Sequence, residues 1–156
     1  MRWITRERPK IDRVACPWLI ARFIDTTPEF LFAPADQVLA RARETGATPF
    51  DVEGVALSHD GSRCSFDALL RDYRLTDPAL EALALIVRGA DTDRLDLAPQ
   101  AAGLLAISLG LSRNCPDDHE VLRHGFVIYD ALYTWCRELR DERHAWNPQS
   151  RAGTAA

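Results

Sequence analysis

The pattern of apolar and polar residues predicts a chain that is mixed in its N-terminal third and helical afterwards. Short apolar runs at 2–5 and 29–33 end at charged residues or proline, as β-strands do. The segments 48–52 and 55–58, which Glu53-Gly54 joins, predict a hairpin of two further strands. We therefore expect a small sheet of short strands in this third.

Apolar residues at helical spacing predict most of the later elements. The segments expected to be helical are 36–44, 66–73, 79–88, 99–109 and a long last helix opened by Pro116. The glycines expected to end the first, third and fourth of these helices are Gly46, Gly89 and Gly110. The stretch 99–109 is apolar nearly all round, which is typical of a central buried helix. The fold class is thus α+β, predominantly helical, with the sheet beside four or five helices.

Length and composition indicate one soluble domain. The chain has 156 residues, 47% hydrophobic and 27% charged, and we expect a folded domain over 1–140 and a disordered tail over 141–156. Charged residues interrupt any signal peptide, and the most apolar stretch, 98–111, is too short to span a bilayer. We expect a cytoplasmic protein without a membrane partner. The net charge of −4 argues against direct binding of duplex DNA by this chain alone.

Four cysteines stand far apart, without a C-x-x-C pair: Cys16, Cys64, Cys115 and Cys136. This spacing excludes a zinc ribbon and a thioredoxin motif. We expect free thiols in a reducing compartment.

The segment 6–25 concentrates positive charge in an acidic chain. Its basic residues are Arg6, Arg8, Lys10, Arg13 and Arg22. Pro17 fits the first position of a helix, so we expect a helix from Cys16 to about Asp25 whose N-terminus attracts anions and lowers the thiol pKa. The arginines either pair with carboxylates of the protein around a buried Cys16, or they form an oxyanion site.

Three other positions are candidates for chemistry. His59 follows the expected hairpin and faces either a ligand, with Arg63 nearby, or solvent. The Asp-x-Asp pair that begins at Asp91 resembles the start of a calcium loop but lacks its glycine and glutamate, which favours capping of the helix at 99 and pairing with the arginines of segment 6–25.

Glu120 and His124 lie one helical turn apart on the last predicted helix and could share a divalent metal, the one cofactor we consider. Such a site would need His59, Cys64 or Asp91 to come alongside. The alternative is a solvated helix edge. No phosphate loop, nucleophile elbow or dinucleotide-binding fingerprint is present, so the motifs name no enzymatic reaction.

The runs 10–25, 88–103 and 124–136 closely resemble the ChrB-type chromate-resistance domain, and the resemblance spans about 2–137. It implies a bacterial cytoplasmic domain. In longer relatives this domain follows a DNA-binding region and makes a chromate-responsive regulator. Because this chain begins at the sensing domain, we expect it to bind or sense chromate, or a similar oxyanion, without a DNA-binding region of its own.

The resemblance also implies a tetrahedral dianion as the ligand, which arginine forks and helix N-termini bind well. The expected binding groups are Arg6, Lys10, Arg13, Cys16 and His59. Two alternatives stay open. One is a metal- or thiol-dependent enzyme that acts on chromate or oxidative by-products, with Cys16 or Cys64 as the thiol. The other is a homodimer formed through the aromatic residues Tyr129, Tyr133 and Trp135.

Overall fold

The computed structural model describes residues 1–145, and the remainder of the predicted tail at 141–156 lies outside the described residues. The strands are β1 (Arg2–Arg6), β2 (Glu29–Ala33) and β3 (Thr48–Pro49). The α-helices are α1 (Asp12–Leu19), α2 (Val38–Thr45), α3 (Ser65–Asp72), α4 (Pro78–Asp91), α5 (Ala101–Asn114) and α6 (Asp118–Thr134). Two π-helical turns, η1 (Ile20–Ile24) and η3 (Trp135–Leu139), extend α1 and α6, and η2 (Leu95–Leu97) is a 3₁₀ turn. The α+β, predominantly helical class is confirmed.

The sheet is parallel, in the order β2-β1-β3. Arg2 pairs with Glu29 at one end of the β1–β2 ladder and Arg6 with Ala33 at the other, while Trp3 pairs with Thr48 of β3. The chain therefore runs as two β-α-β units that share β2, with α1 and α2 as the crossovers. The carboxyl ends of β1 and β3 meet at one edge of the sheet, where the strand order reverses.

The predicted hairpin over 48–52 and 55–58 is wrong. Only Thr48–Pro49 forms a strand, and it pairs with β1. Pro49 has no N–H to extend the ladder, and Asp51 has φ of 49°, which turns the chain away from the sheet. The amide of Asp51 then donates to the carbonyl of Leu57 at 2.8 Å. This turn directs the chain toward His59.

The first helix begins at Asp12, four residues before the predicted start at Cys16. Ile11, with φ of 42°, ends the preceding loop, and Pro17 lies inside the helix instead of opening it. Seven of its eight residues are buried, so α1 is the central helix. The prediction that 99–109 is the central buried helix is wrong, because Ile107 of α5 is 51% exposed.

The glycines act differently from one another. Gly46 ends α2 with φ of 70°, as predicted. Gly89 and Gly110 lie inside α4 and α5, which contradicts their predicted role as helix ends. A Cβ on Gly89 would lie 2.9 Å from both the Ala101 Cβ and the Arg94 carbonyl oxygen, so glycine here permits close packing. Because α4 continues past Gly89, it places Asp91 at its last position.

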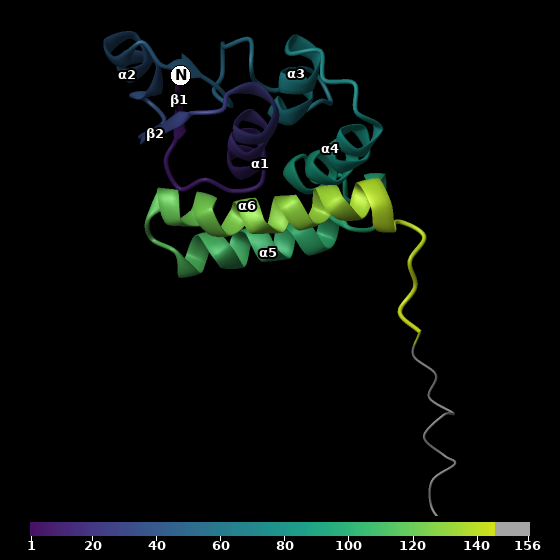
Figure 1. The fold of residues 1–156 in the computed structure, drawn as a ribbon. Coiled ribbons are helices and arrows are strands. Elements are labelled where there is room, and N and C mark those ends of the chain that lie inside the picture. Colours follow the sequence, from purple (N-terminus) through teal and green to yellow (C-terminus); the bar gives the residue numbers. More distant parts are fainter. Residues whose placement is uncertain (146–156) are drawn as a thin grey trace, which may run out of the picture.

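Figure 1 shows α5 and α6 side by side along one face, with the sheet and α2 toward one end and α3 and α4 toward the other. Tyr129 is 2% exposed and donates to the Ile11 carbonyl at 3.0 Å, and Tyr133 and Trp135 are partly buried against the same core. These three aromatic residues of α6 and η3 therefore contribute to the core. No helix within residues 1–145 is both long enough and apolar enough to cross a membrane.

Candidate functional site

Asp12 opens α1 with a buried carboxylate, 1% exposed. Its Oδ2 accepts the amide of Ser65 at 2.6 Å, and its Oδ1 accepts the amide of Phe66 at 3.1 Å. The first turn of a helix has amides without helical partners, so Asp12 caps α3 from another element. The N-cap of α3 itself is Cys64, whose amide donates to Asp67 at 3.0 Å.

Asp51 follows β3 and lies beside the end of β1, because the two parallel strands are neighbours. Its Oδ2 lies 2.8 Å from Arg6 Nη2 and 3.4 Å from Arg13 Nε. Its Oδ1 accepts the Ser65 hydroxyl at 2.7 Å. Arg13 also donates to the Glu7 carbonyl at 2.8 Å, so its guanidinium is largely committed to the protein. Arg6 is freer, with 41% of its side chain exposed.

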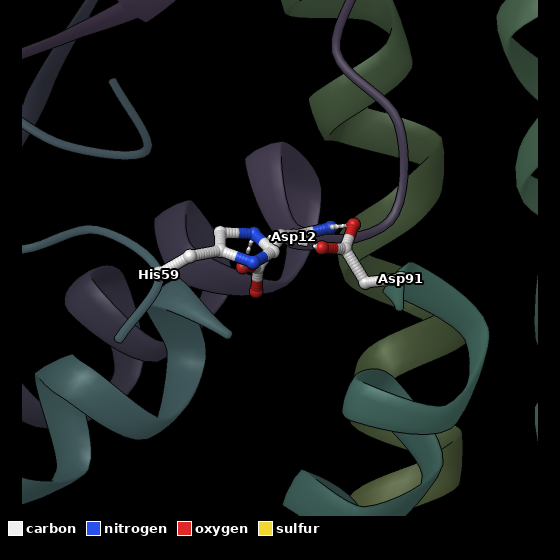
Figure 2. Close-up of side chains that lie close together, drawn as sticks. All are labelled: Asp12, His59 and Asp91. Carbon is white, nitrogen blue, oxygen red and sulfur yellow. Dashed lines mark hydrogen bonds and ion pairs between the residues drawn. The ribbon is translucent and has the colours of Figure 1, made fainter. Parts of the chain in front are cut away.

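The imidazole of His59 lies near three carboxylates, those of Asp12, Asp51 and Asp91, and these four residues form a cluster. Figure 2 shows His59 with Asp12 and Asp91. Its Nε2 lies 3.0 Å from Asp91 Oδ2, 3.4 Å from Asp51 Oδ1 and 3.6 Å from Asp12 Oδ2. The three carboxylates come from the C-terminal end of α4, the turn after β3 and the start of α1. The fold thus brings three aspartates that are far apart in sequence close to one imidazole.

The charges in this cluster depend on one another. The pKa of His59 is raised to about 9, chiefly by its hydrogen bond to Asp51 and also by the charges of Asp12 and Asp91, against a smaller opposing effect of burial. The pKa of Asp12 is raised to about 8, chiefly by burial and also by the charges of Asp91 and Asp51. The cluster therefore favours the protonated form of His59 and the neutral form of Asp12 at neutral pH.

The other two carboxylates have pKa values displaced in opposite directions. Burial raises the pKa of Asp91, and the charge of Asp51 adds to that effect. Burial also acts to raise the pKa of Asp51, but donors from His59, Ser65 and Arg6 outweigh it, so this pKa is lowered. Asp51 is thus the carboxylate that stays ionised.

A pocket of about 460 Å³ opens beside this cluster, at the edge where the carboxyl ends of β1 and β3 meet. Arg6, Asp51 and His59 line it together with the turn 52–55. In open parallel sheets, ligands bind outside the carboxyl ends of the strands where the strand order reverses. The pocket occupies that position.

The structure brings together Arg6, Arg13 and His59 of the predicted oxyanion residues but not the other two. Lys10 lines a different pocket, together with Arg8 and Arg113. Cys16 is fully buried and its thiol donates to Asp12 Oδ1 at 3.5 Å. Burial raises the pKa of Cys16, so the expected lowering of its pKa by a helix N-terminus is wrong.

The thiol-dependent alternative also included Cys64. This side chain is fully buried, and burial raises its pKa too. Both cysteines are therefore protonated and shielded, unlike the exposed thiolates that react.

The predicted metal residues are not brought together. His124 Nε2 lies 3.9 Å from Glu120 Oε1 on α6, whereas His59 belongs to the cluster described above. Within residues 1–145, one group of three potential ligands has all its donor atoms within 4.8 Å of one another: Asp12, His59 and Asp91.

Asp91 does not pair with the arginines of the opening segment, contrary to expectation. It pairs with His59, and its Oδ1 accepts the amide of Asp12 at 3.4 Å. Arg94 pairs locally with Asp96 instead.

Asp12 and Asp51 were not identified from the sequence. A parallel β1–β3 pairing would have revealed Asp51, since it places the residues that follow both strands at one edge. The hydrophobic pattern indicated a hairpin instead. An isolated aspartate at the start of a helix gave no comparable signal for Asp12.

Comparison with known proteins identifies the family of this chain. The ChrB C-terminal domain family matches residues 3–136. Protein ChrB of Cupriavidus metallidurans is 35% identical over 133 residues, which cover 85% of this chain but 40% of that protein. No solved structure matches the chain significantly. The extent of the family match and the identity to ChrB show that this chain belongs to the ChrB C-terminal domain family, which is associated with chromate resistance.

Proposed function

We propose that this chain serves chromate resistance as an oxyanion-binding domain, in which Arg6 and His59 bind chromate in the pocket beside Asp51. Binding of the anion is the signal to which the domain responds. Contact with DNA is left to another region or another polypeptide.

The observation that carries this proposal is the shared anchoring of two cationic groups. Arg6 and His59 both contact Asp51, both are about two-fifths exposed, and both line the same pocket. A carboxylate behind the two groups fixes their positions and leaves their other N–H groups for a ligand. Arg6 Nε is buried and has no hydrogen-bond partner within the described residues, so an anion oxygen that reached it would satisfy an unpaired donor.

The remaining predicted groups take different places in this proposal. Arg13 positions the site, because it is bonded to Asp51 and to backbone carbonyls. Lys10 and Cys16 do not line the pocket and are not assigned to the ligand. The oxyanion is thus bound by an arginine and a histidine instead of a helix N-terminus.

Calorimetric titration of the purified chain with chromate, and separately with sulfate, tests this proposal. Arg6→Ala is expected to weaken chromate binding at least tenfold, because it removes charge-assisted hydrogen bonds. The matched control is Arg2→Ala, on the same strand, where the side chain is exposed and pairs with Glu29. Equal affinities of the two variants for chromate would contradict the proposal. Tighter binding of sulfate than of chromate would identify sulfate, and not chromate, as the ligand.

A further inference from the structure

We infer that Asp12, His59 and Asp91 bind a divalent transition-metal ion beside the pocket that His59 lines. Two carboxylates and an imidazole converge there from α1, the segment after β3, and α4 (Figure 2). This site is distinct from the Glu120 and His124 pair, and it goes beyond oxyanion binding.

The distances suit a metal ion. Two ligand atoms that each lie about 2.1 Å from a common ion are separated by about 3.0–3.5 Å in tetrahedral or octahedral geometry. His59 Nε2 lies 3.0 Å from Asp91 Oδ2 and 3.6 Å from Asp12 Oδ2. All three donor atoms lie within 4.8 Å of one another, so an ion could be held between them once the carboxylates move closer to it.

The charge balance supplies a second, independent reason. Asp12 is 1% exposed and Asp91 has a side chain 16% exposed. Within residues 1–145, each forms an ion pair only with His59, while the arginines nearby pair with Asp51. Burial of an unpaired charge is costly, so two buried carboxyl groups that share one imidazole favour their neutral forms until a cation binds between them. One half-exposed imidazole is a weak partner for two of them.

The carboxylates are also oriented as metal ligands are. The amides of Ser65 and Phe66 fix Asp12, and the amide of Asp12 itself contacts Asp91 Oδ1. A carboxylate has about four lone-pair sites, so these hydrogen bonds leave room for a metal. Such surrounding contacts hold the ligands of metal sites in place.

The donor set selects the class of ion. Carboxylate oxygens suit Mn²⁺ and an imidazole nitrogen suits Fe²⁺ and Zn²⁺, whereas soft thiols are needed for Cu⁺. His59 lines the pocket, so an ion has a route from solvent. Binding would release the imidazolium proton of His59 and the proton of Asp12 to solvent, because metal ligands must be deprotonated, so a divalent ion leaves the net charge of the site unchanged.

Binding of Mn²⁺ alone and of Zn²⁺ alone to the chelator-treated full chain tests the inference, without any oxyanion present. Calorimetry gives the affinity, and the electron paramagnetic resonance signal of free Mn²⁺ gives an independent measure. Asp91→Asn is expected to weaken binding at least tenfold. The matched control, Asp93→Asn, changes an exposed aspartate in the same turn, and asparagine tolerates its φ of 55°, so its affinity should equal that of the wild type.

Thermal melting checks that each variant folds, and His59→Gln provides a second ligand variant if Asp91→Asn does not. Equal metal affinity in the wild type and in the folded ligand variant overturns the inference, as does wild-type binding weaker than millimolar. Metal binding that depends on Asp91, without any chromate binding, leaves this inference standing and refutes the oxyanion proposal. Chromate binding without metal binding refutes this inference and leaves the oxyanion proposal standing.

Discussion

At the scale of single residues, the arginines of this protein divide by burial. Arg88 donates through Nε and Nη2 to both oxygens of Asp67, at 2.9 and 2.6 Å, and Asp67 is 5% exposed. Arg94 makes a similar two-bond contact with Asp96, but both side chains are more than half exposed. The same geometry therefore has very different energetic weight in the two places.

We predict that Arg88→Ala lowers the free energy of unfolding by about 3 kcal/mol, because it leaves the carboxylate of Asp67 buried without its partner. Arg94→Ala should change stability by less than about 0.5 kcal/mol, since exposed ion pairs contribute little. Urea unfolding at neutral pH measures both. Similar losses in the two variants would show that burial does not control the strength of these pairs.

At the scale of elements, glycine was a correct signal for one helix end and a misleading one for others. Gly46 was correctly identified as a helix end, because its backbone adopts the left-handed conformation that glycine favours. Gly110 has the same local signature in sequence but lies within α5 with no atom near its missing Cβ. Whether a glycine ends a helix depends on the conformation of the next residues and on the atoms that pack against it, and a single sequence shows neither.

We predict opposite effects of one substitution at two helical glycines. Gly110→Ala should stabilise the protein by up to about 1 kcal/mol, because alanine is the better helix former and the position is open. Gly125→Ala should destabilise it by about 1–3 kcal/mol, because the new methyl would collide with Val14 of α1. Thermal and urea unfolding of the two variants check the signs. Stabilisation by both would mean that α1 and α6 can separate slightly at no cost.

At the scale of the whole molecule, the candidate site depends on topology. The basic residues Arg6 and Arg13 and the isolated His59 could be identified in sequence because they stand out locally. The carboxylates that surround them come from separate elements, and only the parallel pairing of β1 with β3 and the extension of α4 to Asp91 bring them together. Sequence patterns therefore identified the cationic residues and Asp91, the latter with other expected partners, and they missed Asp12 and Asp51.

The contact between α6 and the end of the first helical segment gives a pH-dependent prediction for the whole fold. Asp130 accepts hydrogen bonds from Arg22 Nε at 2.9 Å, Arg22 Nη2 at 2.8 Å and Trp18 Nε1 at 2.7 Å. The bond with Arg22 is the main reason that the pKa of Asp130 is lowered below the ordinary value of 3.8, while burial acts in the opposite direction. A carboxylate with a lowered pKa in the folded state stabilises the fold above pH 3.8 and loses that contribution as the pH falls through its folded value.

We predict that Asp130→Asn is less stable than the wild type at pH 7, by less than about 1 kcal/mol because the pair with Arg22 is nearly half exposed. The asparagine oxygen can still accept from Trp18, so the difference is mainly that of the charge. It should therefore close as the pH falls from 4 toward 2, and it should shrink at neutral pH in 1 M salt, where ionic screening is strong. Melting temperatures of both proteins across this range give the comparison. A difference that is independent of both pH and salt would assign the role of Asp130 to its hydrogen bond with Trp18 and not to its charge.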